Sequence, residues 1–142
     1  MVGSHLADYL LENTDWEIHG MCRWRSPLDN IEHLIPRINN QDRVFSHFGE
    51  LRDYASLDSV IQDVKPDFIF HLAAQAIVKK SYLKPAETWN SNLIGTLNVL
   101  ESLKSLNKKC TVVIITSDKV YKNIETDRGY KETDLLGGFD PY

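Results

Sequence analysis

The sequence predicts an α/β protein in which a doubly wound parallel sheet is covered by helices on both faces. Strand and helix patterns alternate along the chain, in the order helix, strand, short helix, strand, helix, strand, helix, strand. The strand candidates are short and nearly continuous in apolar residues, which is typical of strands buried on both faces. The helix candidates repeat their apolar residues every three or four positions. Together these observations favour a parallel sheet over an antiparallel one.

The first half of the chain is expected to contain one helix, one short helical turn and two strands. Apolar residues between Leu6 and Leu11 share one face of a helix, with Ser4 as its N-cap and an end near Asn13. The elements expected next are a strand at residues 16–22, a polar loop at 23–30, a helical turn at 31–35 stopped by Pro36, and a strand at 43–48.

The second half is expected to contain two helices and two strands. Helical spacing at residues 57–64 ends at Pro66, which closes the helix. The elements expected after it are a strand at residues 67–72, a long helix at 86–106, a strand at 111–115 and a polar, glycine-rich surface loop at 121–142.

The chain opens on a helix with no strand before it. In a doubly wound sheet the first strand lies in the middle, next to the point where the strand order reverses. We therefore expect residues 1–142 to be a single but incomplete domain, without its first strand and without a C-terminal substrate region.

Composition limits the classes of function. The 142 residues are 42% apolar and 25% charged with a net charge of −4, as in an ordinary globular protein without a nucleic-acid footprint. No signal peptide and no apolar segment of membrane-spanning length is present, so a cytoplasmic location and no membrane partner are expected. Cys22 and Cys110 lack metal-ligand spacing, which predicts reduced thiols and no metal site.

The segment Thr116–Tyr121, TSDKVY, follows the last apolar strand. A plain turn would favour glycine, asparagine or proline, whereas this strand end carries a hydroxyl, a carboxylate and an ammonium in a row. It is therefore a candidate site that needs charge. The alternative is a surface turn with a local pair between Asp118 and Lys119.

Five segments, in the same order and spacing, resemble the extended short-chain dehydrogenase/reductases that act as nucleotide-sugar epimerases and dehydratases. They are Gly3–Leu6 at the end of a glycine-rich phosphate loop, His71–Gln75, Asn92–Thr96, Thr116–Tyr121, and Asp140–Tyr142 at the entry to a Tyr-x-x-x-Lys motif. The second half of the chain is most similar to CDP-glucose 4,6-dehydratases. The first half, with Arg23-Trp-Arg-Ser26, is more similar to GDP-mannose 4,6-dehydratases.

This resemblance implies that residues 1–142 form part of a Rossmann domain that binds NAD or NADP. Gly3 would lie at the pyrophosphate. Arg23, Arg25 and Ser26 follow the second expected strand position of such a domain and favour the extra phosphate of NADP, although CDP-glucose dehydratases generally use NAD. The other residues implied at the cofactor are Glu50 and Leu51, which replace an Asp-Leu pair near the adenine, and Leu72, Ala73, Ala74, Gln75, Asn92 and Thr116.

The resemblance also implies catalytic roles. Ser117 would hydrogen-bond the C4 hydroxyl of a sugar, and Tyr142 would accept the proton of that hydroxyl. Asp118 would act as the acid toward the C6 hydroxyl. Lys119 stands where related dehydratases carry Glu, and it would either abstract the C5 proton or stabilise the enolate as a fixed cation.

The function implied is that of a nucleotide-sugar 4,6-dehydratase, with CDP-glucose as the first expected substrate and GDP-mannose as the second. Residues 1–142 alone are expected to be inactive, and the full-length protein is expected to be a homodimer or a higher homo-oligomer. Two alternatives remain open: a 4-epimerase or reductase of the same superfamily, and a nucleotide-binding module without catalytic activity.

Overall fold

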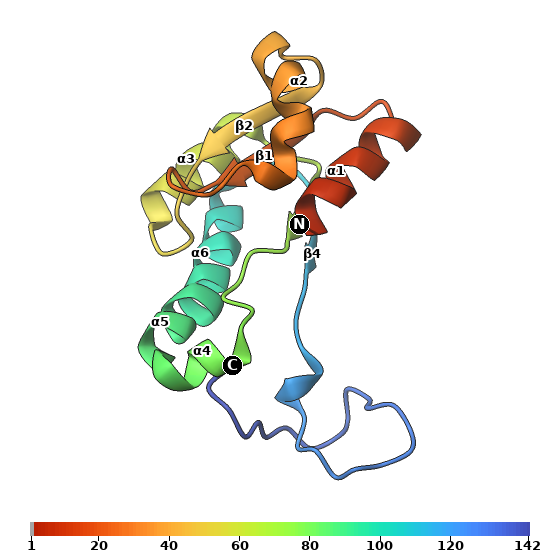
Figure 1. Cartoon of the computed structure of the whole chain (residues 1–142), viewed down its shortest axis with the longest axis vertical. Coiled ribbons are helices and arrows are strands. Elements are labelled where there is room, and N and C mark those ends of the chain that lie inside the picture. Colours follow the sequence, from red (N-terminus) through yellow and green to blue (C-terminus); the bar gives the residue numbers. More distant parts are fainter. Residues whose placement is uncertain (1) are drawn as a thin grey trace.

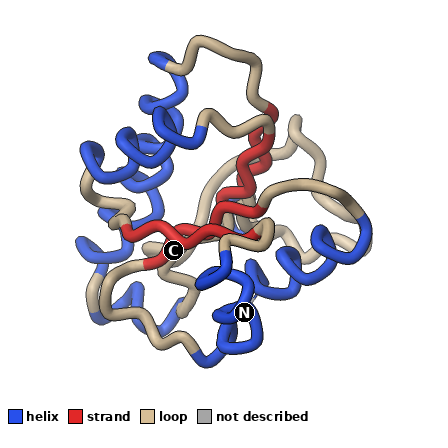
Figure 2. The backbone as a smooth tube through the Cα atoms, turned by 90° about the horizontal axis from the view of Figure 1, so that it is seen from above, coloured by secondary structure: helices blue, strands red, loops and turns tan. Residues whose placement is uncertain are grey.

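The computed structural model describes residues 2–142 and has the α/β order that the sequence predicts (Figure 1). The four strands are β1 (Ile18–Cys22), β2 (Val44–Phe48), β3 (Phe68–His71) and β4 (Thr111–Ile114). β1 pairs with β2 and β3 pairs with β4, and both pairs are parallel. In the described residues the sheet thus consists of two separate two-stranded parts, with helices around them (Figure 2).

Helices connect the strands and cover them. α1 (Val2–Asn13) precedes β1, and the 3-10 helix η1 (Asp29–Leu34) runs into α2 (Ile35–Asn40) before β2. α3 (Tyr54–Val64) connects β2 to β3, with the Asp53 carboxylate capping its first turn and Lys65 ending it in a left-handed conformation. The elements between β3 and β4 are α4 (Val78–Leu83), α5 (Pro85–Trp89), the π-helical turn η2 (Asn90–Ile94), α6 (Gly95–Ser102) and the 3-10 turn η3 (Leu103–Ser105). A further 3-10 turn, η4 (Asp118–Val120), follows β4.

Three predictions of local structure are wrong. Ser4 lies inside α1 instead of capping it. Pro36 lies in the first turn of α2 instead of stopping a helix, because the missing N–H of a proline costs nothing in a first turn. The long helix expected at residues 86–106 is interrupted by the π-helical turn at Asn90–Ile94, and α4 was not expected at all.

Contacts at both ends of β3 join it to the β1 side of the molecule, and a third contact fixes the connection from α1 to β1. The rings of Trp16, just before β1, and Phe68, the first residue of β3, are stacked with centroids 4.7 Å apart. The guanidinium of Arg43 donates to the carbonyl oxygens of Thr14 at 2.5 Å and Trp16 at 3.2 Å, which fixes the connection from α1 to β1. At the other end of β3, Leu72 lies beside the start of α1, where a Cβ on Gly3 would be 3.8 Å from its Cδ1.

The best-buried core lies where α3 packs against α6. Leu57 and Ile61 of α3 and Val99 of α6 are all less than 10% exposed. Gly95 opens α6 against Leu51, and a Cβ on Gly95 would lie 2.9 Å from the Cβ of Leu51. None of the helices in residues 2–142 has the length and apolar character needed to cross a bilayer.

Gly95→Ala is expected to lower the free energy of unfolding by about 1–2 kcal/mol, because the added methyl must displace the chain at Leu51. The gain in helix propensity, up to about 1 kcal/mol, offsets only part of this cost. Gly3→Ala is the matched control, since Gly3 is also helical and has ordinary space around its Cβ position. Urea denaturation of both variants checks the prediction, and equal stability would contradict it.

Candidate functional site

Most of the residues singled out from the sequence lie at the carboxyl ends of the strands. Arg23–Arg25 follow β1, Gly49 and Glu50 follow β2, Leu72–Gln75 follow β3, and Thr116–Lys119 follow β4. Within each pair the strands are parallel, so their carboxyl ends open on the same edge. In open α/β sheets this edge is where ligands bind.

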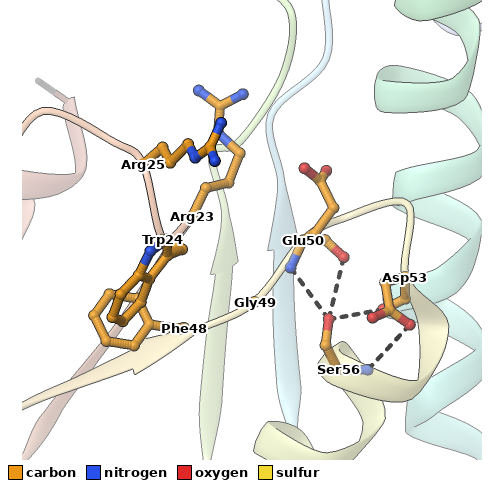
Figure 3. Close-up of a pocket in the computed structure, with 8 residues that line it drawn as sticks. All are labelled: Arg23, Trp24, Arg25, Phe48, Gly49, Glu50, Asp53 and Ser56. Atoms are coloured by element: carbon orange, nitrogen blue, oxygen red, sulfur yellow. Dashed lines mark hydrogen bonds between the residues drawn. The ribbon is translucent and has the colours of Figure 1, made fainter.

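A hollow of about 570 Å³ lies at the ends of β1 and β2; we call it the arginine hollow. Figure 3 shows the guanidinium groups of Arg23 and Arg25 reaching toward the same side, while the indole of Trp24 lies against Phe48. The centroids of these two rings are 4.9 Å apart in an edge-on arrangement. The residues that line the hollow are Arg23, Trp24, Arg25, Phe48, Gly49, Glu50, Asp53 and Ser56.

In the arginine hollow the carboxylate of Glu50 is paired, whereas, within the described residues, the guanidiniums of Arg23 and Arg25 are not. Glu50 accepts two hydrogen bonds from the guanidinium of Arg52, at 3.1 and 3.2 Å. These bonds hold the pKa of the Glu50 carboxyl below its usual value, and the nearby charge of Arg23 adds to the effect. Neither Arg23 nor Arg25 has a carboxylate within ion-pair distance in the part of the chain that the structure describes. The two guanidiniums are therefore available to an anionic ligand.

Other predicted cofactor residues lie outside this hollow. Leu51 packs against Gly95, and its carbonyl oxygen accepts a hydrogen bond from the Asn98 side chain at 2.8 Å. The N–H of Ser26 donates to the carbonyl of Arg23 at 2.9 Å, which closes the turn after β1 without lining the hollow. Trp24, Phe48, Asp53 and Ser56 line it although the sequence analysis did not assign them.

A second hollow, of about 290 Å³, lies at the end of β4; we call it the tyrosine hollow. Three of the four predicted catalytic residues, Ser117, Lys119 and Tyr142, line it together with Asn92. Asp118, the fourth, does not line it, and neither does Thr116. The full lining is Thr88, Trp89, Asn92, Leu93, Ser117, Lys119, Val120, Gly138, Asp140, Pro141 and Tyr142.

Hydrogen bonds order the strand end at this hollow. The Ser117 hydroxyl donates to a carboxylate oxygen of Asp118 at 3.3 Å and accepts from the N–H of Lys119 at 3.2 Å. The ammonium of Lys119 lies 3.3 Å from Oδ2 of Asp140. Oδ1 of Asp140 accepts the N–H of Tyr142 at 2.9 Å. Asp140, which the sequence analysis did not assign, thus contacts two of the predicted catalytic residues.

Asn92 braces the segment that follows β3. Its Oδ1 accepts the N–H of Gln75 at 2.8 Å, and its Nδ2 donates to the carbonyl of Gln75 at 3.2 Å. Asn92 lies in the π-helical turn, a feature that is frequent at functional sites. The segment it holds includes Ala73 and Ala74, whose small side chains are exposed.

His71, at the end of β3, is a buried structural group. It is 7% exposed, and this burial lowers the pKa of its imidazole. The hydroxyl of Thr96 donates its one proton to the carbonyl of Asn92 at 2.6 Å, so Nε2 of His71 must donate to that hydroxyl at 2.9 Å. The histidine therefore ties β3 to the first turn of α6, where the Thr96 hydroxyl bonds the carbonyl of Asn92.

The described residues form neither a disulfide nor a cluster of metal ligands. Both cysteines are free. Within residues 2–142, no group of three or more histidine, cysteine, aspartate or glutamate side chains is placed to hold a metal ion.

Comparison with known proteins places this geometry in a family. A family model described as GDP-mannose 4,6 dehydratase matches residues 1–142. A CDP-glucose 4,6-dehydratase of Salmonella typhimurium is 44% identical over 108 residues, which cover 76% of this chain and 30% of that protein. A GDP-mannose 4,6-dehydratase of Vibrio cholerae is 34% identical over 146 residues, which cover 99% of this chain and 38% of that protein. The chain thus spans about a third of the length of these relatives.

Solved structures agree on the fold. A UDP-glucose 4-epimerase of Thermotoga maritima, determined with UDP-glucose, superposes on the whole chain with a TM-score of 0.80 at 22% identity. A UDP-glucose 4-epimerase of Thermus thermophilus, determined with NAD, gives 0.80 at 24% identity. Each match covers 43% of the solved chain. At this level of identity the comparison concerns the fold alone, and it confirms the predicted Rossmann-like class.

Proposed function

Because the chain belongs to the GDP-mannose 4,6 dehydratase family, we propose that it supplies the nucleotide-binding part of an enzyme that converts a nucleotide-linked hexose to its 4-keto-6-deoxy form. One observation carries the proposal: Ser117, Lys119 and Tyr142 line the same hollow, although Tyr142 is 23 positions after Lys119 in the sequence. A hydroxyl, a cation and a phenol around one space are the groups that oxidation and dehydration of a sugar require.

The residues present fit a nicotinamide dinucleotide. The arginine hollow offers two guanidiniums without carboxylate partners in the described residues, which suits a phosphate. Gly3 near the start of α1 leaves the backbone open beside Leu72. When bound, the nicotinamide would accept a hydride from C4 of the sugar and return it to C6. We propose NADP rather than NAD, because the carboxyl end of β1 carries Arg23 and Arg25 and no acid.

Ser117 and Tyr142 are assigned to the C4 hydroxyl. Tyr142 accepts the proton of this hydroxyl as C4 becomes a ketone, and Ser117 hydrogen-bonds the same oxygen. The Ser117 hydroxyl is held in place by the N–H of Lys119, which donates to it. This contact comes from the 3-10 turn η4, which begins at the residue after Ser117.

Asp118 and Lys119 are assigned to dehydration. Once C4 is a ketone, the C5 proton becomes acidic and the C6 hydroxyl can leave as water, which requires a proton at the C6 oxygen. Asp118 delivers that proton. Its carboxylate now accepts the Ser117 hydroxyl, so it must turn toward the hollow when the sugar binds. Lys119 lines the hollow, and from there it either removes the C5 proton or stabilises the negative charge on the C4 oxygen.

We propose CDP-glucose as the first substrate to test and GDP-mannose as the second. The CDP-glucose 4,6-dehydratase relative has the higher identity, 44% against 34% for the Vibrio GDP-mannose enzyme, but it matches a shorter stretch of the chain. The nucleobase contacts are not assigned to any residue of this chain.

The test is product analysis by NMR with the full reading frame that contains the chain. Incubation with CDP-glucose, and separately with GDP-mannose, is expected to convert one sugar to a product with a C6 methyl group and a C4 keto or hydrated keto group. No external oxidant should be needed, since the hydride taken from C4 is returned to C6. A product that keeps its C6 hydroxyl and differs only in configuration at C4 would instead support a 4-epimerase.

A further inference from the structure

Asp140 carries a charge at the tyrosine hollow without a role in the assignments above. Its side chain is only 10% exposed, against 43% for Lys119. Both carboxylate oxygens are used: Oδ2 by the ammonium of Lys119 at 3.3 Å and Oδ1 by the N–H of Tyr142 at 2.9 Å. A nearly buried carboxylate is costly unless it is paired and hydrogen-bonded. Here both partners belong to residues assigned to the chemistry.

The loop that carries Asp140 is fixed against the turn that carries Lys119. Tyr121 and Leu136 form an antiparallel bridge, and the N–H of Gly137 donates to the carbonyl of Val120 at 2.9 Å. Gly138 lies so close that an added Cβ would be 3.0 Å from the carbonyl oxygen of Lys119. The approach of Asp140 to Lys119 is therefore set by main-chain contacts on both sides.

We propose that Asp140 is a positioning residue that holds the ammonium of Lys119 at a fixed place relative to the main chain of Tyr142. This inference rests on the proposed function and assigns the role of Lys119 within it. The Asp140 carboxylate lies 3.3 Å from the ammonium of Lys119, so the two groups form an ion pair at the hollow. Lys119 then acts as a cation and hydrogen-bond donor, not as the base that removes the C5 proton.

The proton balance follows from this assignment. Loss of the C5 proton places negative charge on the C4 oxygen, and the ammonium of Lys119 stabilises that charge. The C5 proton passes to the carboxylate of Asp118 and from there to the C6 oxygen. The C5–H and C6–O bonds break, a C5–C6 double bond forms, and one water leaves without a net change of charge on the protein.

Asp140→Asn tests the positioning role because the amide oxygen can still accept the N–H of Tyr142 while the negative charge is lost. In the full reading frame, kcat for dehydration is expected to fall by about 10- to 100-fold with little change in KM. Reduced nicotinamide should accumulate during turnover, because C4 oxidation continues while elimination slows. Asp67→Asn is the matched control: it breaks a lysine–aspartate pair, Lys108 to Asp67 at 2.6 Å, in which Asp67 is 77% exposed.

A double-mutant cycle separates positioning from a general structural role. If Asp140 acts through Lys119, Asp140→Asn should cost little in a Lys119→Met background, and the two losses should not add. Asp140→Glu should restore part of the activity by keeping the charge. Fully additive losses, or an Asp140→Asn enzyme as fast as the wild type, would overturn the proposal.

A readout independent of turnover distinguishes this proposal from the proposed function. The amide resonance of Tyr142 is expected to shift in Lys119→Met, because Asp140 loses its ionic partner and its hydrogen bond to that amide changes. An unchanged Tyr142 resonance overturns the positioning role whether or not the protein is active. Failure of the wild-type protein to form any 4-keto-6-deoxy product overturns the proposed function instead.

Discussion

Replacing Tyr142 with Phe in the full reading frame is expected to lower kcat for formation of the 4-keto product by at least about 100-fold. The phenol is the group assigned to take the C4 hydroxyl proton, and general base catalysis of this kind contributes about 10²- to 10⁴-fold. The ring itself remains, so the packing of the partly buried Tyr142 should change little. The measurement is the initial rate of product formation at saturating sugar, with KM determined in parallel.

Tyr9→Phe is the control for this prediction. Tyr9 lies on α1 with 61% of its surface exposed, and it lines neither hollow. Loss of the Tyr9 hydroxyl should leave kcat and KM unchanged. A Tyr142→Phe enzyme that keeps more than about a tenth of the wild-type rate would show that another group accepts the proton.

The strand assignments are confirmed: those at residues 67–72 and 111–115 rested on nearly continuous apolar runs, and that at residues 16–22 on a loose alternation. β2, β3 and β4 lie within one or two residues of the expected bounds, and α3 ends just before Pro66 as expected. The errors arose where local preference is overridden by other contacts. α4 contains Lys79 and Lys80 and has little apolar periodicity, but its Ser81 is fully buried.

Without the family resemblance, the sequence could predict only those residues of the site that lie directly after a strand. Ser117 and Lys119 share a hollow because they directly follow a parallel strand, which is the usual place for a ligand site in such sheets. Asp140 reaches Lys119 only through the return of a loop 21 positions later, and its pairing cannot be inferred from spacing. The π-helical turn at Asn92 likewise was not visible in the apolar spacing, and Asn92 in this turn contacts Gln75 across 17 positions of the sequence.

Replacing both Arg23 and Arg25 with Ala is expected to weaken binding of NADP by at least about 100-fold and to leave binding of NAD nearly unchanged. Hydrogen bonds to a charged group contribute about 1.5–3 kcal/mol each, and the extra phosphate of NADP is the group that would receive them. Calorimetric titration of the full-length protein with each dinucleotide measures both affinities. Binding of NADP by the wild type should also weaken with added salt more steeply than binding of NAD.

Arg37→Ala is the matched control, because Arg37 lies on α2 in an exposed ion pair with Asp42 at 2.8 Å and does not line the arginine hollow. It should bind both dinucleotides as the wild type does. Two results would contradict the NADP assignment: tighter binding of NAD than of NADP by the wild type, or equal losses for both dinucleotides in the double variant. The second result would mean that the two guanidiniums contact the part that NAD and NADP share, such as the pyrophosphate, instead of the group that distinguishes them.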